Sequence, residues 1–226
     1  MSHDHTREKQ YQIMMEYRQK RGLETLGLMT SQAWYDDPKR LTFTLSRYKF
    51  VAKMLAGSSH VLEVGCADAF GTRIVVQEVT QLTAVDFDPL FVEDTNARMG
   101  GRWKFECRVH DMLKGPVAGE FDATYALDVL EHILPENEER FLRNMVATLA
   151  PYGTMIIGMP SLESQPYASP LSKEGHVNCK TMPDLKKTMQ LLFQNVFMFS
   201  MNDEVVHTGY HKMAHYLFAL CCGKKT

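Results

Sequence analysis

The chain has 226 residues, of which 45% are hydrophobic and 23% are charged, and its formal net charge is −2. This composition is typical of a globular protein with room for one large domain or two small ones. A net charge so close to zero gives no reason to expect a nucleic-acid partner. Because no apolar run reaches the length of a membrane span and the polar start is unlike a signal peptide, no membrane association is expected.

The chain carries five cysteines, an odd number without the spacing of disulfide pairs or zinc ligands. We therefore expect no disulfide framework and a reducing, cytoplasmic environment. His207, Tyr210, His211 and His215 lie close together near the C-terminus, but their spacing matches no familiar ligand pattern. No metal is expected from the sequence, and the formation of a homodimer stays open.

Residues 1–58 are expected to form a helical cap that precedes the first strand. Apolar residues at helical spacing predict one helix around Tyr11–Arg18 and another over Leu41–Leu55. Trp34–Pro38 is predicted to be a turn whose proline opens the second helix. Two roles for this cap are open, a lid over a binding site and packing alone.

The segment His60–Pro89 predicts a strand, a small-residue loop, a helix and a second strand. The apolar run Val61–Val64 is typical of a buried parallel strand. The small side chains of Gly65–Gly71 allow a sharp turn and a close approach of the backbone to a ligand. After a helix over Thr72–Val79, the second strand ends at Asp86, where a nucleotide-binding βαβ unit presents an acid to ribose hydroxyls.

The rest of the chain alternates predicted helices and strands in one α/β domain. Further strands are predicted at Phe105–Val109, Phe121–Asp128, Thr154–Met159, Asn195–Met201 and Ala214–Cys222, and helices at Pro89–Arg98, Pro135–Leu149 and Thr181–Phe193. The last two strands are joined without a helix and must therefore pair antiparallel. The polar, proline-containing loop Leu162–Thr181 is long enough to suggest a function.

Three motifs resemble a known family. Glu63-Val64-Gly65-Cys66-Ala67-Asp68-Ala69 resembles the Asp/Glu-x-Gly-x-Gly-x-Gly motif of class I S-adenosylmethionine-dependent methyltransferases, with alanine at two glycine positions. The run from Phe121 to His132, which includes Asp-Val-Leu-Glu-His, resembles a subgroup of ubiquinone-biosynthesis and sugar or polysaccharide O-methyltransferases. Gly175-His176-Val177-Asn178 resembles a segment that borders the acceptor pocket in that subgroup, although Lys180 stands where the subgroup has phenylalanine.

The resemblance implies S-adenosylmethionine as cofactor and S-adenosylhomocysteine as product. It also implies a doubly wound, mostly parallel sheet of seven strands with an antiparallel last strand, in a single domain of cap (1–58) and Rossmann-like core (59–226). The cofactor-binding residues that it implies are Glu63, Gly65, Cys66, Ala67, Asp86, Phe87, Asp111, Met112 and Asp128. The Glu63 carboxylate suits the ammonium and sulfonium charges of this cofactor. His132 and His176 are candidate proton acceptors, because imidazole titrates near operating pH.

The expected reaction is direct methyl transfer to a hydroxyl group of a small molecule, and the subgroup resemblance favours a sugar or glycan precursor. Lys173 and Lys180, close to His176, suggest an anionic acceptor. The alternatives are an N-methyltransferase, a quinone or phenol O-methyltransferase, a non-catalytic nucleotide-binding protein, and an NAD-dependent oxidoreductase. Glu63 argues against the last, because a dinucleotide site places a pyrophosphate over this loop and has no use for a carboxylate there.

Overall fold

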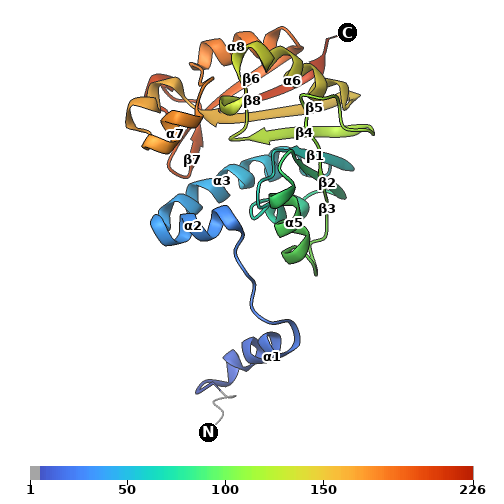
Figure 1. Cartoon of the computed structure of the whole chain (residues 1–226), viewed down its shortest axis with the longest axis vertical. Helices are drawn as coiled ribbons and strands as arrows, with labels where there is room; N and C mark the ends of the chain where they lie inside the picture. The colour runs from blue at the N-terminus through green and yellow to red at the C-terminus, as the bar shows by residue number, and fades with distance from the viewer. Residues whose placement is uncertain (1–5, 226) are drawn as a thin grey trace.

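Eight strands form one sheet in the order β3-β2-β1-β4-β5-β8-β6-β7 in the computed structural model, which describes residues 6–225 (Figure 1). The strands are β1 (His60–Val64), β2 (Gln81–Asp86), β3 (Glu106–Val109), β4 (Phe121–Leu127), β5 (Leu149–Pro160), β6 (Phe193–Asn202), β7 (Val205–His207) and β8 (Tyr216–Lys224). Strands β3, β2, β1, β4 and β5 run parallel, and β8 pairs antiparallel with both β5 and β6. The predicted α/β fold with an antiparallel last strand is confirmed.

The expected number of seven strands is too low by one. The additional strand, β7, lies in a segment that was predicted to be irregular, and it pairs with the end of β6. Asn202 pairs with Val205 across a two-residue turn, in which Asp203 adopts a φ of +48°. Because such turns usually contain glycine at a position with positive φ, this hairpin has a weak sequence signal.

Eight helices are described among residues 6–225. They are α1 (Gln12–Arg21), α2 (Leu28–Asp36), α3 (Lys39–Met54), α4 (Thr72–Val76), α5 (Pro89–Arg98), α6 (Pro135–Ala147), α7 (Pro170–Gly175) and α8 (Met182–Gln190). The predicted turn at Trp34–Pro38 is wrong for its first three residues, which belong to α2. The Asp37 amide donates to the Ala33 carbonyl, so helical bonding stops only at the residue before Pro38, where the ring of proline disfavours it.

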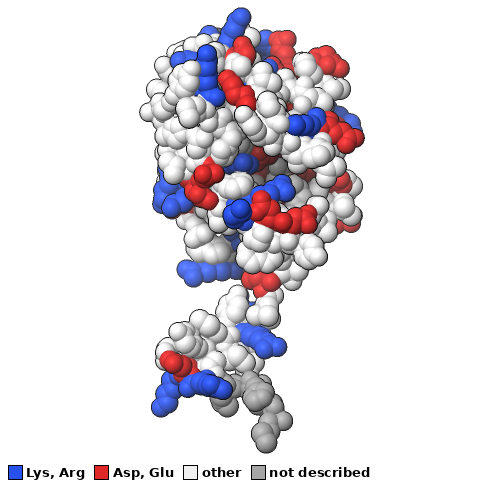
Figure 2. Space-filling view, turned by 90° about the vertical axis from the view of Figure 1, so that its left-hand side faces the viewer, with Lys and Arg blue, Asp and Glu red and all other residues white. Residues whose placement is uncertain are grey.

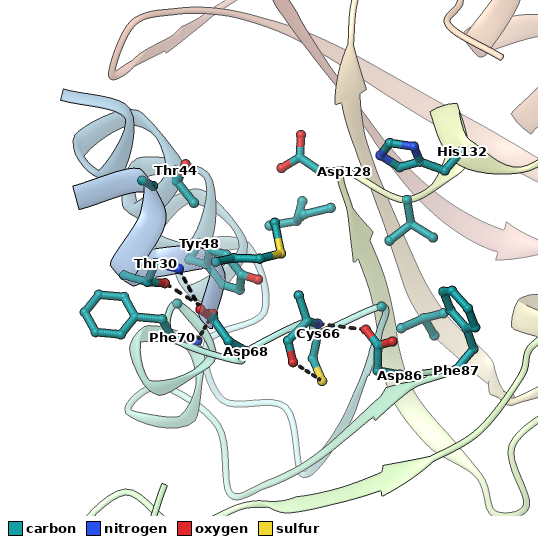
Figure 3. A pocket seen from close by; sticks show the side chains of 18 of the residues that line it. Thr30, Thr44, Tyr48, Cys66, Asp68, Phe70, Asp86, Phe87, Asp128 and His132 are labelled. Atoms are coloured by element: carbon teal, nitrogen blue, oxygen red, sulfur yellow. Dashed lines mark hydrogen bonds between the residues drawn. The ribbon is translucent and has the colours of Figure 1, made fainter. Parts of the chain in front are cut away.

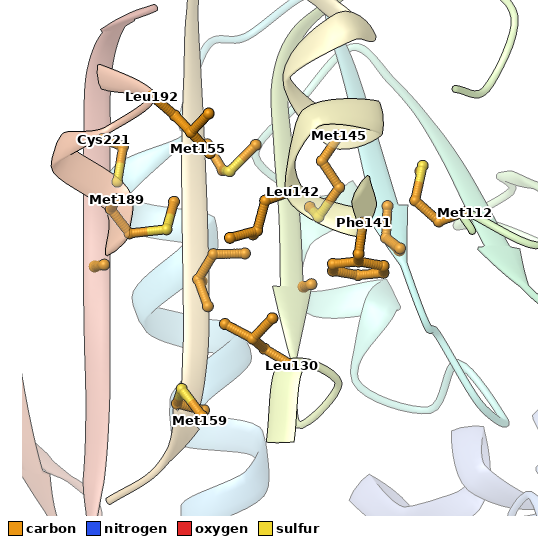
Figure 4. Packing of buried hydrophobic residues seen from close by; sticks show 14 of the residues in the cluster. Met112, Leu130, Phe141, Leu142, Met145, Met155, Met159, Met189, Leu192 and Cys221 are labelled. Carbon is orange, nitrogen blue, oxygen red and sulfur yellow. The ribbon is translucent and has the colours of Figure 1, made fainter. Parts of the chain in front are cut away.

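Alternating side chains of the strands point to opposite faces of the sheet and build two apolar cores. One core joins β1, β4, β5 and β8 to α6 and α8, and several of its members are methionines (Figure 4). The other core joins the opposite face to α3, α4 and α5. Met155 and Ile157 belong to the first core and Ile156 between them belongs to the second, as expected for a sheet covered on both faces.

Helix α1 stands apart from the domain at the end of an extended segment (Figure 1). It contributes no buried residue to either core. On the face shown in Figure 2, basic and acidic side chains are interspersed rather than gathered by sign. Within residues 6–225, no helix has the length and apolar character that crossing a membrane requires.

The predicted loop Leu162–Thr181 contains two short helices. A 3₁₀ turn, η3 (Leu162–Tyr167), begins after Ser161, whose side chain accepts the Ser164 amide, and α7 begins after Ser169, whose side chain accepts the Ser172 amide. Serine is a favoured residue at such helix starts. The end of the segment lies at the carboxyl end of β4, where the Val177 and Asn178 amides donate to the Glu131 carbonyl and His176 lies beside His132.

Candidate active site

A cavity of about 800 Å³ lies at the carboxyl ends of β1, β2 and β4, beneath the cap helices α2 and α3 (Figure 3). This is where open α/β sheets bind their ligands. The cavity wall contains the predicted site residues Gly65, Cys66, Ala67, Asp86, Phe87, Asp111, Met112, Asp128 and His132. The cap contributes the wall residues Met29, Thr30, Gln32, Ala33, Arg40, Leu41, Thr44, Leu45 and Tyr48. The cap residues therefore cover a site and do more than pack against the core.

The loop after β1 adopts the left-handed conformation at three alternate positions. Gly65, Ala67 and Ala69 have φ values of +76°, +46° and +50°. A side chain at Gly65 is excluded, because its Cβ would lie 2.4 Å from a methyl carbon of Val129. The two alanines that replace glycines of the family motif thus keep the glycine-like backbone, at a cost of roughly 1–2 kcal/mol each.

Asp86 fixes this loop from the end of β2. Its carboxylate accepts the backbone amide of Ala67 at 2.8 Å and that of Asp88 at 3.0 Å. A carboxylate has about four acceptor positions, so these two bonds leave capacity for ligand hydroxyls on the cavity side.

Asp68, in the same loop, connects the core to the cap (Figure 3). Helix α2 begins after Gly27, which has no side chain to cap it, and Asp68 accepts the Thr30 amide at 2.7 Å instead. It also accepts the Thr30 hydroxyl at 3.2 Å. A carboxylate at a helix N-terminus satisfies a free amide and interacts favourably with the helix dipole.

Glu63 is one of two predicted site residues that do not reach the cavity wall. Its carboxylate is 1% exposed and accepts the hydroxyls of Thr72 at 2.6 Å and Tyr48 at 3.0 Å, underneath the loop. Burial raises the pKa of Glu63 from 4.5 to about 7, against the lowering effect of these hydroxyls. Glu63 therefore supports α4 and the wall residue Tyr48 from below.

Asp128 follows β4 and is paired with the cap. Arg47 of α3 donates through one Nη atom to both carboxylate oxygens, at 2.9 Å and 2.7 Å. The guanidinium carbon also lies 3.9 Å from the ring centroid of Tyr216. Asp128 has a φ of +56°, a conformation that aspartate tolerates better than most residues.

His132 and His176 come together at the same end of the cavity. Their ring centroids lie 5.1 Å apart, with His132 on the wall and His176 behind it. Burial lowers the pKa of His176, and the neighbouring His132 lowers it further. Glu131, beside them, is fully buried, and burial raises its pKa well above the ordinary value.

Phe87, Asp111 and Met112, which the resemblance implies as cofactor-binding residues, also lie on the cavity wall. Asp111 accepts the Leu113 amide at 2.9 Å, Met112 is buried, and the Phe87 side chain is 73% exposed. The two lysines that suggested an anionic acceptor are not on the wall. Lys180 pairs with Glu138 at 2.9 Å, and Lys173 donates to the Pro166 carbonyl.

Comparison with known proteins agrees with this site. A family model described as a methyltransferase domain matches residues 62–157. Nodulation protein S of Bradyrhizobium diazoefficiens is 31% identical over 143 residues, which are 60% of this chain and 68% of that protein. The chain belongs to the class I S-adenosylmethionine-dependent methyltransferases. The narrower resemblance to the ubiquinone and sugar O-methyltransferases stays a prediction.

Solved methyltransferase structures share the fold of this methyltransferase. N-methyltransferase NodS from Bradyrhizobium japonicum, in complex with S-adenosyl-L-homocysteine, aligns with a TM-score of 0.60 at 20% identity, over 84% of this chain and 90% of that chain. A complex of DhpI with S-adenosylhomocysteine aligns with a TM-score of 0.61 at 14% identity, over 85% of this chain and 90% of that chain. S-adenosylmethionine is the cofactor of this methyltransferase.

Several residues of the site were not singled out from the sequence. Thr30 and Asp68 had no assigned role, because a contact between residues 38 positions apart leaves no local pattern. Arg47 lies within the predicted cap helix Leu41–Leu55, but no sequence pattern pairs it with Asp128. Glu131 did carry a signal, since it lies inside the Asp-Val-Leu-Glu-His motif, next to a histidine.

Proposed function

We propose that this methyltransferase transfers the methyl group of S-adenosylmethionine to a nitrogen atom of a small molecule. Its similarity to nodulation protein S supports nitrogen, because a NodS protein of known structure is an N-methyltransferase. This proposal replaces the preference for a hydroxyl acceptor that the sequence motifs suggested. Hydroxyl methylation, of a sugar or of a phenol, becomes the competing outcome of the test below.

The charge of the cavity wall carries the proposal. Four carboxylates line it, from Asp68, Asp86, Asp111 and Asp128, and the cations beside them in the described residues include Arg40 on the wall and Arg47, which pairs with Asp128. Such a wall favours cationic over anionic ligands. An amine is cationic in water near neutral pH, so the same field that favours the sulfonium cofactor also concentrates an amine acceptor.

The cofactor orientation that we propose follows the order of the strand ends. The backbone of Gly65–Ala67 holds the methionine part, and Asp86 accepts the ribose hydroxyls. Phe87, Asp111 and Met112 surround the adenine. Asp128, which lies between the cap residues and His132 on the cavity wall, would offer its negative charge to the sulfonium (Figure 3). The acceptor's reacting group is placed against His132.

The chain itself has mainly to align the two reacting groups. When bound, S-adenosylmethionine would supply an electrophilic methyl group, which a neutral amine would take with its lone pair while S-adenosylhomocysteine leaves. An amine that arrives as a cation would first give up one proton to solvent. The cap residues and the apolar part of the wall exclude water from this step.

The test offers matched acceptors together with methyl-labelled S-adenosylmethionine. Glucosamine is paired with glucose, and benzylamine with benzyl alcohol, so that each pair differs by an amino group in place of a hydroxyl, and phenol is added to test the phenolic alternative. Mass spectrometry with fragmentation should place the label on nitrogen, and label on oxygen would overturn the nitrogen assignment.

Asp128→Asn should lower the rate with the amine by roughly tenfold, as expected for the loss of about 1.4 kcal/mol of charge interaction. Asp122→Asn, at the other end of β4, is the matched control and should leave the rate unchanged.

A further inference from the structure

Three side chains at the acceptor end of the cavity form a cluster of metal-binding type. Glu131, His132 and His176 each offer one ligand atom, and these atoms lie within 4.8 Å of one another. In the part of the chain that the structure describes, no other group of three His, Cys, Asp or Glu side chains comes together in this way. We propose that the cluster binds a divalent transition-metal ion through two imidazoles and one carboxylate.

The Glu131 carboxylate provides the first argument. Its side chain is 0% exposed, and within residues 6–225 neither carboxylate oxygen has a hydrogen-bond partner. A buried carboxylate without partners is costly, and such groups are usually paired with a cation or bound to a metal. The nearest cationic side chain, Arg47, is already bonded to Asp128. A metal ion between Glu131 and the two imidazoles supplies the missing partner.

The hydrogen bonds of the histidines provide a second, independent argument. His132 Nδ1 lies 2.9 Å from the Gly175 carbonyl, and His176 Nδ1 lies 2.9 Å from the Gln165 side-chain oxygen. The Gln165 amide is oriented by its own NH₂ group, which donates to the Ser161 carbonyl at 3.1 Å. Because these oxygens only accept, both Nδ1 atoms carry the proton, and both Nε2 atoms keep their lone pair.

This tautomer is the one that metal-binding histidines adopt. A ligand imidazole almost always donates its other N–H to a carbonyl or carboxylate, which fixes the orientation of the ring. Here both rings are held in that way before any ion binds. The neighbouring helix α7 supplies the Gly175 carbonyl, and the turn η3 supplies the Gln165 side-chain carbonyl.

The donor set selects the kind of ion. Two imidazoles and a carboxylate suit zinc, manganese, iron, cobalt or nickel, whereas magnesium and calcium prefer oxygen ligands alone. Metal–ligand bonds of about 2.1 Å place neighbouring tetrahedral ligands about 3.4 Å apart, so small side-chain rotations would close the cluster around an ion. Three protein ligands leave at least one coordination position for water or for a group of the acceptor.

The proposal changes the role expected for the two histidines. An imidazole whose Nε2 lone pair binds an ion cannot accept a proton, so His132 and His176 act as ligands rather than as the bases that the sequence suggested. His132 is on the cavity wall, which places the ion beside the proposed acceptor position. Ion binding itself does not rest on the proposed N-methylation, and it is measured here without any acceptor.

The test is a titration of the chelator-treated full chain with cobalt(II) chloride, followed by visible absorption, and with zinc chloride, followed by calorimetry. The unaltered chain should bind one ion per chain and show the d–d bands of protein-bound cobalt. Glu131→Gln and His176→Ala should each weaken binding by roughly a hundredfold. His211→Ala removes a histidine outside the cluster and should bind as the unaltered chain does. Binding of S-adenosylhomocysteine to every variant checks that it is folded.

Two results would overturn the proposal. One is the absence of cobalt and zinc binding at micromolar concentrations in the unaltered, folded chain. The other is binding that both substitutions leave unchanged, which would assign the ion to other groups, such as the adjacent Cys66 and Cys107 thiols. Neither result would contradict the proposed N-methylation, because the test of that proposal locates the methyl label in an assay to which no metal is added.

Discussion

Glu63 is a carboxylate whose environment changes its chemistry near neutral pH. It accepts two hydroxyls, from Thr72 and Tyr48, but no cationic side chain bonds to it. Burial therefore dominates and raises its pKa to about 7. Because the pKa is higher in the folded than in the unfolded chain, the contribution of Glu63 to stability is full below pH 4.5 and is lost as the pH rises through about 7.

We predict that Glu63→Gln removes this pH dependence. Between pH 4.5 and 7 the free energy of unfolding of the unaltered chain should fall by about 3 kcal/mol relative to that of the variant, since one pKa unit corresponds to about 1.4 kcal/mol. Urea unfolding at several pH values measures the difference. Glu139→Gln, which changes an exposed carboxylate, is the matched control and should follow the unaltered chain. Parallel profiles for the unaltered chain and Glu63→Gln would contradict the prediction.

Single residues were predictable where an acid stands at the end of a strand or within two residues after it. Asp86, Asp111 and Asp128 all lie on the cavity wall, because the carboxyl ends of parallel strands meet at one edge of the sheet. Their partners were not predictable. Glu63 precedes the loop, as the family motif requires. Side chains alternate between the two faces of β1, however, and that of Glu63 lies on the face covered by helices, where it points under the loop instead of into the cavity.

At the scale of elements, the β1–α4 loop shows how alanine can replace glycine. Ala67 and Ala69 keep positive φ values, which alanine adopts only at a cost of roughly 1–2 kcal/mol. Glycine removes that cost and loses about 0.5–1 kcal/mol to its greater freedom in the unfolded chain. An alanine-to-glycine substitution in this loop should therefore change the free energy of unfolding more favourably than the same substitution at a position with negative φ.

We predict that Ala67→Gly raises the free energy of unfolding by roughly 0.5–1 kcal/mol. Ala69→Gly should be close to neutral, because the Ala69 methyl is fully buried and its loss costs about 0.8 kcal/mol. Ala97→Gly, at an exposed helical position of α5, is the control and should destabilise by about 1 kcal/mol. Urea midpoints of the three variants test the order, and a destabilising Ala67→Gly would show that the loop does not carry this strain.

Most elements of the core were predicted within a few residues because their periodicity is strong, although β5 begins at Leu149, where the end of a helix was predicted, and not at Thr154. Helix α5 has the predicted bounds Pro89–Arg98, fixed by a proline at its start and by an Asp88 cap. Elements whose ends depend on tertiary contacts were not predicted. Helix α2 starts where Asp68 caps it from the loop after β1, and α7 forms where the segment Leu162–Thr181 meets β4.

At the scale of the whole molecule, the position of the cap on the core depends on a few long-range polar contacts. Arg47 of α3 bonds to Asp128 after β4, and its guanidinium lies over Tyr216 of β8. The Arg47 side chain is 13% exposed and that of Asp128 is 36% exposed. No sequence pattern links these residues, so the docking of the cap was open until the fold was known.

We predict that Arg47→Met lowers the free energy of unfolding by roughly 3 kcal/mol, because it leaves Asp128 and the buried Glu131 without their nearest cation. Lys53→Met on the same helix breaks an exposed ion pair with Glu78 and should cost at most about 1 kcal/mol. Urea unfolding of both variants makes the comparison, and S-adenosylhomocysteine affinity should fall only for Arg47→Met, since Asp128 is on the cavity wall. Equal small losses would mean that the Arg47–Asp128 pair does not hold the cap on the core, and that the cofactor end of β4 is organised independently of it.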